Sequence, residues 1–279
     1  MWRRIEFIVY AAVLIFCIFR YANIDLDESG NRRLPATPPS PAVLLPDGAP
    51  LPNDNGNVLV ELEAEVHSGV GTAFLVDGSG TYVTARHVID GCEAIYIVRS
   101  GGGYEEVVSA VSGRNRDFAV LKSASRQRFH MQLSARVLGR GSEGYMMGFP
   151  QGNAADVRAT VIGATEMRSS GRYRAREPVL AWVERERRPG FGGSLGGISG
   201  GPVFDAGGTV VGTVVAGAPR RGRVYTTHPR VFREAGLLEI SKKGRTPKLE
   251  GGIHAGNFDT IGKTLRASGA IKQVYCKAG

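Results

Sequence analysis

The chain has 279 residues, of which 42% are hydrophobic and 22% are charged, and its formal net charge is +9. This is the composition of a globular protein and argues against a wholly disordered chain. The positive charge raises the question of nucleic acid binding, but most basic residues alternate with acidic ones, as in residues 172–188, RYRAREPVLAWVERERR. A solvated hairpin face explains that pattern better, so we expect no nucleic acid partner.

Residues 1–22, MWRRIEFIVYAAVLIFCIFRYA, contain an apolar run from Phe7 to Phe19. The run is shorter than the roughly 20 residues of a membrane span, but its charged flanks can reach toward the headgroups. We therefore predict a membrane anchor here. A cleavable signal peptide is the alternative, although cleavage after Ala22 would place Arg20 where a small residue is expected. Basic residues are nearly balanced on the two sides, and we expect the body of the protein on the extracytoplasmic (periplasmic) side.

The anchor is followed by a Pro-rich linker over residues 23–57. Seven of the fourteen prolines lie between Pro35 and Pro52. Such a segment forms neither a helix nor an interior strand, and it is typical of an extended tether.

From residue 58 onward, about ten short apolar runs such as GTAFLV and TVVGTVVAG are separated by Gly, Asn, Asp and Pro. This pattern predicts an all-β domain over residues 58–238, either a barrel or a sandwich. A helix is expected near residues 229–238 and another around residues 260–268. Residues 239–279 are basic and Gly-rich, and we predict a C-terminal tail to which the sequence assigns no role.

Three cysteines, Cys17, Cys92 and Cys276, have no spacing that suits a zinc site. Cys17 lies in the N-terminal apolar run. Cys92 and Cys276 are therefore either two free thiols or one disulfide, and the sequence leaves both possibilities open.

Two serines in residues 191–204, FGGSLGGISGGPVF, share the pattern Gly-x-Ser-x-Gly, which is a known setting for a nucleophile. In an α/β-hydrolase a helix follows this serine directly. Here a Gly-rich segment, LGG, follows Ser194, and a strand hairpin is expected after Ser199. We reject the α/β-hydrolase for both. Only Ser199 lies in Gly-x-Ser-Gly-Gly-Pro, where the backbone N–H groups of Gly197 and Ser199 can be directed toward an oxyanion. We predict that Ser199 is the nucleophile and Ser194 a loop residue.

A serine nucleophile needs a base, and the base needs a carboxylate. His87 lies near the end of an apolar alternating run, GTYVTARHVI. A packed core histidine is the alternative interpretation of this position. Asp117 opens the run DFAVLK and can point inward from the end of a strand. Asp90 is too close to His87 in sequence, and Asp205 suits a turn. The remaining histidines, which lie among polar or turn residues, are His67, His130, His228 and His254.

The segments TARHVID, DFAVL and GGISGGPVF, in this order, resemble the chymotrypsin-fold serine endopeptidases. The closer likeness is to the compact bacterial branch that includes the HtrA-type proteases, here without room for a PDZ domain. GTAFLV before the histidine and GYMMGFPQG before the serine add to the likeness, which covers about residues 67–232. The resemblance implies two antiparallel six-stranded barrels with the active site between them. It also implies hydrolysis of polypeptides without a metal or organic cofactor.

The resemblance further implies a primary specificity pocket lined by Gly193 and by the strand residues Thr213, Val214 and Val215. These residues carry no charge, so we expect cleavage after small or medium aliphatic residues. Ile198 stands where related enzymes have Asp or Asn, which excludes activation by an ion pair with a newly cut N-terminus. The Gly-rich loop before it, residues 190–197, is expected to be partly disordered until substrate or a partner orders it.

The sequence therefore predicts a membrane-anchored serine endopeptidase in which Ser199 attacks, His87 is the general base and acid, and Asp117 orients His87. A catalytically inactive pseudo-protease that only binds peptides is the main alternative. A basic binder of nucleic acid or lipid surfaces is a third possibility. The sequence indicates neither the physiological substrate nor the oligomeric state.

Overall fold

The computed structural model describes residues 57–279 except positions 64, 100, 126–128, 219–221 and 243–250. The predicted anchor, residues 1–22, and all but the last residue of the predicted linker lie outside these described residues. Within the described part of the chain, no helix combines the length and the apolar character that a membrane span needs.

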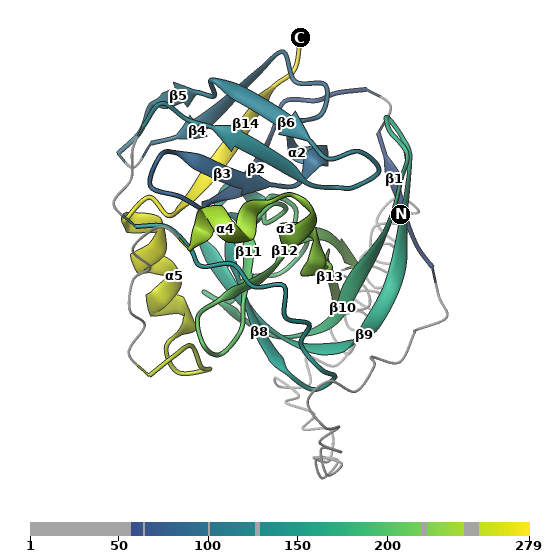
Figure 1. The fold of residues 1–279 in the computed structure, drawn as a ribbon, viewed down its shortest axis with the longest axis vertical. Coiled ribbons are helices and arrows are strands. Elements are labelled where there is room, and N and C mark those ends of the chain that lie inside the picture. The colour runs from purple at the N-terminus through teal and green to yellow at the C-terminus, as the bar shows by residue number, and fades with distance from the viewer. Residues whose placement is uncertain (1–56, 64, 100, 126–128, 219–221, 243–250) are drawn as a thin grey trace, which may run out of the picture. The chain divides into compact units, whose positions relative to one another are not determined.

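The first of two β-sheets has the strand order β5-β4-β14-β2-β3-β7-β6, with antiparallel neighbours (Figure 1). The Val107 N–H donates to the Ile95 carbonyl and the Val108 N–H to the Lys122 carbonyl, so β5 and β6 form two halves of one bent segment that closes this sheet. The strands are β2 (Gly69–Leu75), β3 (Thr81–Thr84), β4 (Ala94–Val98), β5 (Tyr104–Glu106), β6 (Ser109–Ser112), β7 (Ala119–Lys122) and β14 (Ile271–Lys277).

The second sheet has the order β1-β9-β10-β13-β12-β11-β8, and β8 also pairs with β9. Six of its strands therefore close a ring, while β1 is added outside the ring, parallel to β9. The strands are β1 (Val58–Leu62), β8 (Glu143–Gly148), β9 (Ala155–Gly171), β10 (Ala175–Arg188), β11 (Pro202–Phe204), β12 (Val210–Ala218) and β13 (Arg223–Thr227). The prediction of a mostly β fold with two barrel-like sheets is confirmed.

Short helices connect or cover the strands. They are α2 (Arg86–Ile89), α3 (Arg230–Glu234), α4 (Leu237–Ser241) and α5 (Phe258–Ala267), with a 3₁₀ turn η1 at Pro150–Gly152. The helices predicted near residues 229–238 and 260–268 are therefore present as α3 with the start of α4, and as α5.

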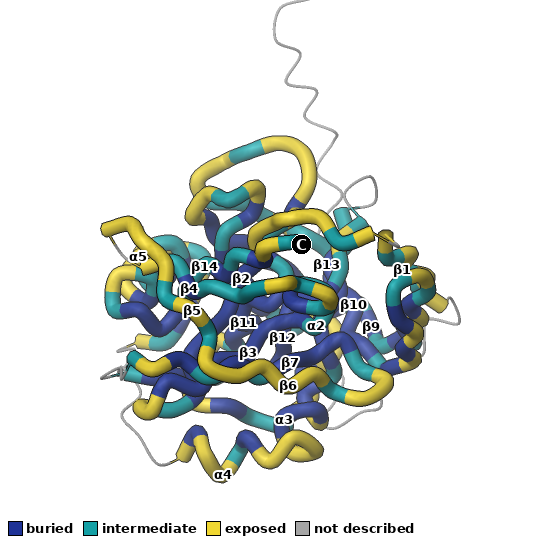
Figure 2. Tube along the Cα trace, turned by 90° about the horizontal axis from the view of Figure 1, so that it is seen from above, coloured by how far each residue is buried: buried dark blue, intermediate teal, exposed yellow. Residues whose placement is uncertain are grey.

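The core lies inside the two sheets and between them. β9 alternates buried and half-buried residues over most of its length, as expected for a strand with one face against a core. Figure 2 shows β11 and β12 buried near the centre, whereas β6 is exposed. One core cluster joins Phe74 of the first sheet, Tyr145 of the second and Phe258 of α5, so α5 contributes to the contact region between the sheets.

The C-terminal residues belong to the same domain and do not form a separate tail. β14 lies between β2 and β4, with Val274 opposite both Gly71 and Ile97. α5 is attached to the second sheet by a pair of hydrogen bonds from the Arg266 guanidinium to the buried Asp156 carboxylate. The predicted domain boundary after residue 238 is therefore wrong, because removing β14 would split the first sheet.

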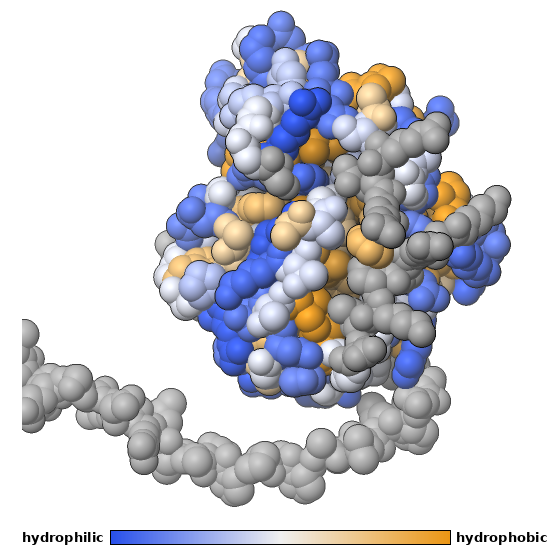
Figure 3. Space-filling model, turned by 90° about the vertical axis from the view of Figure 1, so that its left-hand side faces the viewer, coloured by the Kyte–Doolittle hydropathy of each residue, from blue (hydrophilic) through white to orange (hydrophobic). Residues whose placement is uncertain are grey.

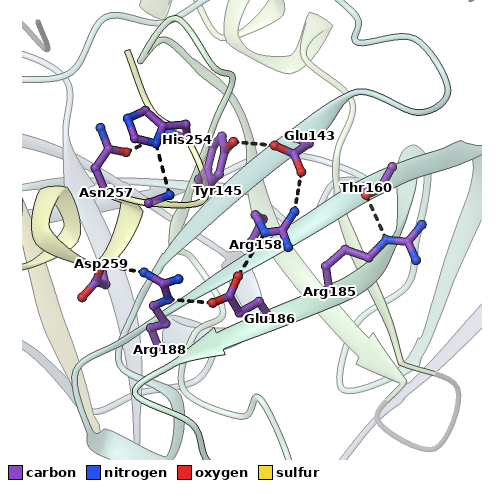
Figure 4. Close-up of polar contacts among 11 residues, drawn as sticks. Glu143, Tyr145, Arg158, Thr160, Arg185, Glu186, Arg188, His254, Asn257 and Asp259 are labelled. Carbon is purple, nitrogen blue, oxygen red and sulfur yellow. Dashed lines mark hydrogen bonds and ion pairs between the residues drawn. The ribbon is translucent and has the colours of Figure 1, made fainter. Parts of the chain in front are cut away.

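β9 and β10 form a long two-stranded arm that extends from the second sheet alongside the first (Figure 1). The charged residues along β10 pair with acids and bases on neighbouring elements, as in the chain of contacts from Glu143 through Arg158, Glu186 and Arg188 to Asp259 of α5 (Figure 4). This arrangement matches the solvated hairpin face expected from the sequence. Figure 3 likewise shows hydrophilic side chains interspersed with smaller hydrophobic areas on another face of the described residues.

A disulfide between Cys92 and Cys276 joins the turn after α2 to β14, with the two Cα atoms 5.5 Å apart and a sequence separation of 184. The alternative that the sequence left open is thus resolved in favour of a disulfide. The bond fixes the C-terminal strand next to the helix that carries His87.

We predict that Cys276→Ser lowers the free energy of unfolding by about 2–5 kcal/mol, because the cross-link restricts the unfolded chain. Urea titration of the purified protein measures the effect. The neighbouring substitution Lys277→Ser removes only an exposed ion pair with Glu93 and should leave stability nearly unchanged. Equal stability of wild type and Cys276→Ser under oxidising conditions would contradict the cross-link.

Candidate active site

His87 lies in the one-turn helix α2, immediately after the buried strand β3. The sequence suggested that the strand continues to the histidine, but β3 ends at Thr84 and the backbone turns into α2. Its side chain is 22% exposed, which is enough for one side of the imidazole to face a cavity. The turn also brings the His87 backbone N–H to Asp117, at 2.9 Å from Oδ1.

Asp117 lies two residues before β7 and is only 3% exposed. Its Oδ2 lies 2.6 Å from His87 Nδ1. Its Oδ1 accepts the His87 N–H and also the Tyr173 hydroxyl, at 2.9 Å each. The Asp117 N–H donates to Glu177 Oε1 at 2.6 Å. Asp117 therefore has a partner for both carboxylate oxygens and for its backbone N–H.

The two groups shift each other's pKa in the directions expected of an acid–base pair. Burial alone would lower the pKa of His87, but the charge and hydrogen bond of Asp117 outweigh burial and raise it above its ordinary value. Burial would raise the pKa of Asp117, but His87 and the Tyr173 hydroxyl hold it below its ordinary value. The buried Glu177 behaves differently, because burial raises its pKa to about 7.

Ser199 follows a glycine turn that only glycine can form. Gly197 has φ +97°, and a Cβ there would lie 2.5 Å from the Phe149 carbonyl oxygen. Among the described residues, neither the Gly197 N–H nor the Ser199 N–H has a hydrogen-bond acceptor. Both N–H groups predicted to bind an oxyanion are therefore available for one.

Thr72 of β2 connects this turn to the first sheet. Its N–H donates to the Ser199 carbonyl and its hydroxyl to the Gly197 carbonyl, both at 2.8 Å. The Thr84 hydroxyl in turn donates to the Thr72 carbonyl at 2.7 Å. Sequence analysis did not identify Thr72 as part of the site, because its partners in the serine turn lie more than 100 residues away along the chain.

The Gly-rich loop before Ser199 is held by hydrogen bonds, which differs from the partly disordered loop expected from its glycine content. The Gln151 side-chain amide donates to the carbonyls of Gly192 and Ser194, and its N–H donates to the Gly196 carbonyl. Arg187 adds a bond to the Gly193 carbonyl at 3.0 Å. The GYMMGFPQG segment indicates the family resemblance, but no local pattern in it indicates this role of Gln151.

Ser194 is exposed, and its hydroxyl accepts the N–H of Gly196 within the loop, in agreement with its prediction as a loop residue. Of the two other acids considered, Asp205 accepts the Thr209 N–H in a turn, also as expected. Asp90 pairs with Arg86 and Arg172. Among the described residues, it makes no hydrogen bond to the His87 ring, whose partner is Asp117.

His87 and Ser199 line the same cavity, which has a volume of about 280 Å³. The other residues that line it come from the segment before β2 and the first residues of β2, from α2 and the residue after it, from the arm, from the Gly-rich loop and from β14. They are Val66, His67, Gly69, Val70, Val88, Asp90, Arg172, Gly196, Gly197 and Cys276.

The residues predicted for the specificity pocket do not appear among those that line this cavity. Gly193 is exposed and lines a separate hollow with residues 184–187. Thr213, Val214 and Val215 are each at most 2% exposed. Their role in substrate selection stays a prediction.

Two barrel-like antiparallel sheets, with a His–Asp contact on the first and a serine turn on the second, define a chymotrypsin-like serine protease fold. The sequence profile of the trypsin-like peptidase domain matches residues 71–212, just over half of the chain. The chain belongs to this family. No curated protein matches its sequence.

Solved structures of the same fold have low sequence identity. The active form of the Rv3671c protease from M. tuberculosis has a TM-score of 0.51 and 19% identity, over 63% of this chain and 75% of that one. The HtrA-type protease AlgW with a decapeptide has a TM-score of 0.48 and 19% identity, over 62% and 52%. The MamO protease domain from Magnetospirillum magneticum has a TM-score of 0.45 and 18% identity, over 60% and 94%. At these identities the likeness concerns the fold alone.

We predict that His87 titrates with a midpoint above about 6.5, its ordinary value, because the imidazolium is stabilised by Asp117. The Cε1 proton signal in a nuclear magnetic resonance titration measures this midpoint. Asp117→Asn should move it to lower pH, because burial and the Arg172 charge then favour the neutral ring.

His228 is the internal control for this titration. Burial and the Arg230 charge lower its pKa, so its midpoint should lie below about 6.5 in both proteins. An identical His87 midpoint in wild type and Asp117→Asn would contradict the proposed electrostatic pairing.

Proposed function

We propose that this protein is an active serine endopeptidase that hydrolyses polypeptides through a Ser199–His87–Asp117 triad. The observation that carries the proposal is the 2.6 Å contact between His87 Nδ1 and a buried Asp117, on a histidine that shares a cavity with Ser199. Membership of the trypsin-like peptidase family supports a polypeptide substrate.

In the proposed reaction, the Ser199 hydroxyl attacks the scissile carbonyl while His87 Nε2 takes its proton. Asp117 keeps the Nδ1 proton in place and stabilises the imidazolium. The N–H groups of Gly197 and Ser199 bind the oxyanion. His87 then donates the proton to the leaving amine, and water hydrolyses the acyl-enzyme by the same route. The mechanism uses no metal or organic cofactor.

The alternative is a pseudo-protease of the same fold that binds peptides without cutting them. The His87–Asp117 pair favours catalysis, because a buried charged carboxylate is costly to keep and acid–base pairs of this kind beside a cavity are typical of active sites. The N–H groups of Gly197 and Ser199, which have no acceptor among the described residues, also favour catalysis, because an oxyanion could bind there.

We predict that Ser199→Ala, His87→Ala and Asp117→Asn each lower kcat for peptide hydrolysis by about 10⁴-fold or more, with the fold retained. The double variant Ser199→Ala/His87→Ala should lose little more than either single variant, because the groups act as a unit. Steady-state kinetics on a peptide library measure both effects.

Ser194→Ala is the matched control, since it removes a hydroxyl five residues away in the same loop and should change kcat by less than about threefold. Loss of hydrolysis in Ser194→Ala with activity kept in Ser199→Ala would overturn the assignment. A wild-type protein that binds peptides and never cleaves them would favour the pseudo-protease.

We further propose that residues 1–22 anchor the protein in a membrane, with the catalytic domain on the extracytoplasmic side. The apolar N-terminal run supports the anchor. The Cys92–Cys276 disulfide supports export, because disulfides persist in oxidising compartments and are rare in the cytosol.

Thiol trapping tests this location. When cells are lysed in an alkylating reagent, Cys92 and Cys276 should react only after reduction. Deletion of residues 1–22 should leave both cysteines reactive from the start, because the protein then stays in the reducing compartment. Immediate alkylation of both cysteines in the full-length protein would contradict the proposed location.

A further inference from the structure

The tip of the β9–β10 arm lies against the triad, although it belongs to the second sheet and Asp117 to the first. The turn between the two strands, residues 172–174, projects beyond the last strand pair, Ser169 opposite Ala175. Two residues of this turn make hydrogen bonds to the His87–Asp117 pair, one to each residue. The Tyr173 hydroxyl donates to Asp117 Oδ1 at 2.9 Å, and the Arg172 guanidinium donates to the His87 carbonyl at 3.0 Å.

Tyr173 is fixed in this position by its surroundings. It is 8% exposed, and the Arg86 guanidinium lies 3.9 Å from the centre of its ring. Arg86 is held in turn by an ion pair with Asp90. Tyr173 is not among the residues that line the cavity at Ser199, so it does not contact substrate there.

The hydrogen bond from the Tyr173 hydroxyl restricts the rotation of the Asp117 carboxylate. A carboxylate with one free oxygen can rotate about its Cβ–Cγ bond, which turns its plane away from the imidazole. Here Oδ1 is occupied by two donors, the His87 N–H and the Tyr173 hydroxyl. Oδ2 alone is left for His87 Nδ1.

The arm also holds the backbone of Asp117. Glu177 of β10 is 1% exposed, and its Oε1 accepts the Asp117 N–H at 2.6 Å. β1 pairs with the outer edge of the same arm, with Leu62 opposite Gly171, the residue before the turn. The tip is thus placed by strand pairing on both sides of β9.

We propose that Tyr173 is a positioning residue of the triad, whose hydroxyl holds the Asp117 carboxylate in the orientation that pairs with His87. This inference rests on the proposed endopeptidase function for its kinetic consequence and on geometry alone for its effect on His87. The charged and titratable groups around this pair are Arg172, Glu177, Arg86 and Asp90. None of them is altered by removing the Tyr173 hydroxyl.

The test is Tyr173→Phe, which removes one oxygen and keeps the ring. Without the hydroxyl, Oδ1 keeps only the His87 N–H, so the carboxylate charge is less shared and attracts the imidazolium more strongly. The His87 titration midpoint should therefore move to higher pH. The carboxylate is also held by one donor fewer, so the imidazole is fixed less firmly toward Ser199, and we expect kcat to fall by about 10- to 100-fold, with KM unchanged within about twofold.

Tyr145→Phe is the matched control. Tyr145 is also buried, and its hydroxyl donates to a carboxylate, Glu143, at 2.7 Å, on the second sheet away from the triad. It should lose a comparable hydrogen bond without moving the His87 midpoint or kcat. This separates positioning from a general loss of stability.

Two further measurements keep the proposal falsifiable if Tyr173→Phe folds poorly. Replacing Tyr173 by 3-fluorotyrosine makes the hydroxyl a stronger donor and should move the His87 midpoint to lower pH. In an Asp117→Asn background, Tyr173→Phe should no longer raise that midpoint, because the carboxylate charge is gone.

An unchanged His87 midpoint in both folded Tyr173 variants would overturn the proposal. So would a kcat loss in Tyr173→Phe no larger than that in Tyr145→Phe. If the wild-type protein hydrolyses no peptide, the endopeptidase function fails, but the His87 titration still decides whether Tyr173 positions Asp117.

Discussion

The rest of the site depends on a carboxylate that is kept charged inside the protein. Asp117 is 3% exposed, and burying an unpaired carboxylate costs several kcal/mol. The cost is offset by one imidazole and two hydrogen-bond donors on the carboxylate oxygens. His87, the arm tip and the end of β7 must all be in place for these contacts to form. The contacts of the buried Asp117 therefore connect the two sheets, because Tyr173 and Glu177 belong to the arm of the second sheet.

A second link between the sheets is Thr72. It bonds to the turn that carries Ser199, and it lies on the strand that pairs with β14. The turn that carries Ser199, on the second sheet, is thereby fixed to the same sheet that holds His87. Positioning of this kind matters because a shift of about 1 Å in a reacting group can cost roughly 100-fold in rate. The C-terminal strand and its disulfide lie beside the site, since Cys276 lines the cavity that holds His87 and Ser199.

The parts of the fold that the sequence predicted correctly are those with a local signal, since the apolar runs of β2, β8 and β12 alternate or cluster as strands do. Ser199 and its glycines also have a local signal, because they lie in one short peptide, and their role stays a prediction. The burial of β14 was missed because IKQVYCK carries two lysines, and its partners in β2 and β4 lie about 180–200 residues away. Tyr173 and Glu177 were missed for the same reason, since they meet Asp117 across 56 and 60 residues of sequence. The order of the Gly-rich loop depends on Gln151, which no local pattern relates to that loop.

The central claim is that His87 and Asp117 activate one particular serine. Labelling with a fluorophosphonate, followed by mass spectrometry of the digested protein, tests it most directly, because the probe reacts with an activated serine hydroxyl and leaves ordinary ones unmodified. The account predicts one phosphonylated residue, Ser199, with labelling abolished by His87→Ala and strongly slowed by Asp117→Asn. Absence of labelling in the folded wild-type protein, or labelling at Ser194, would contradict it.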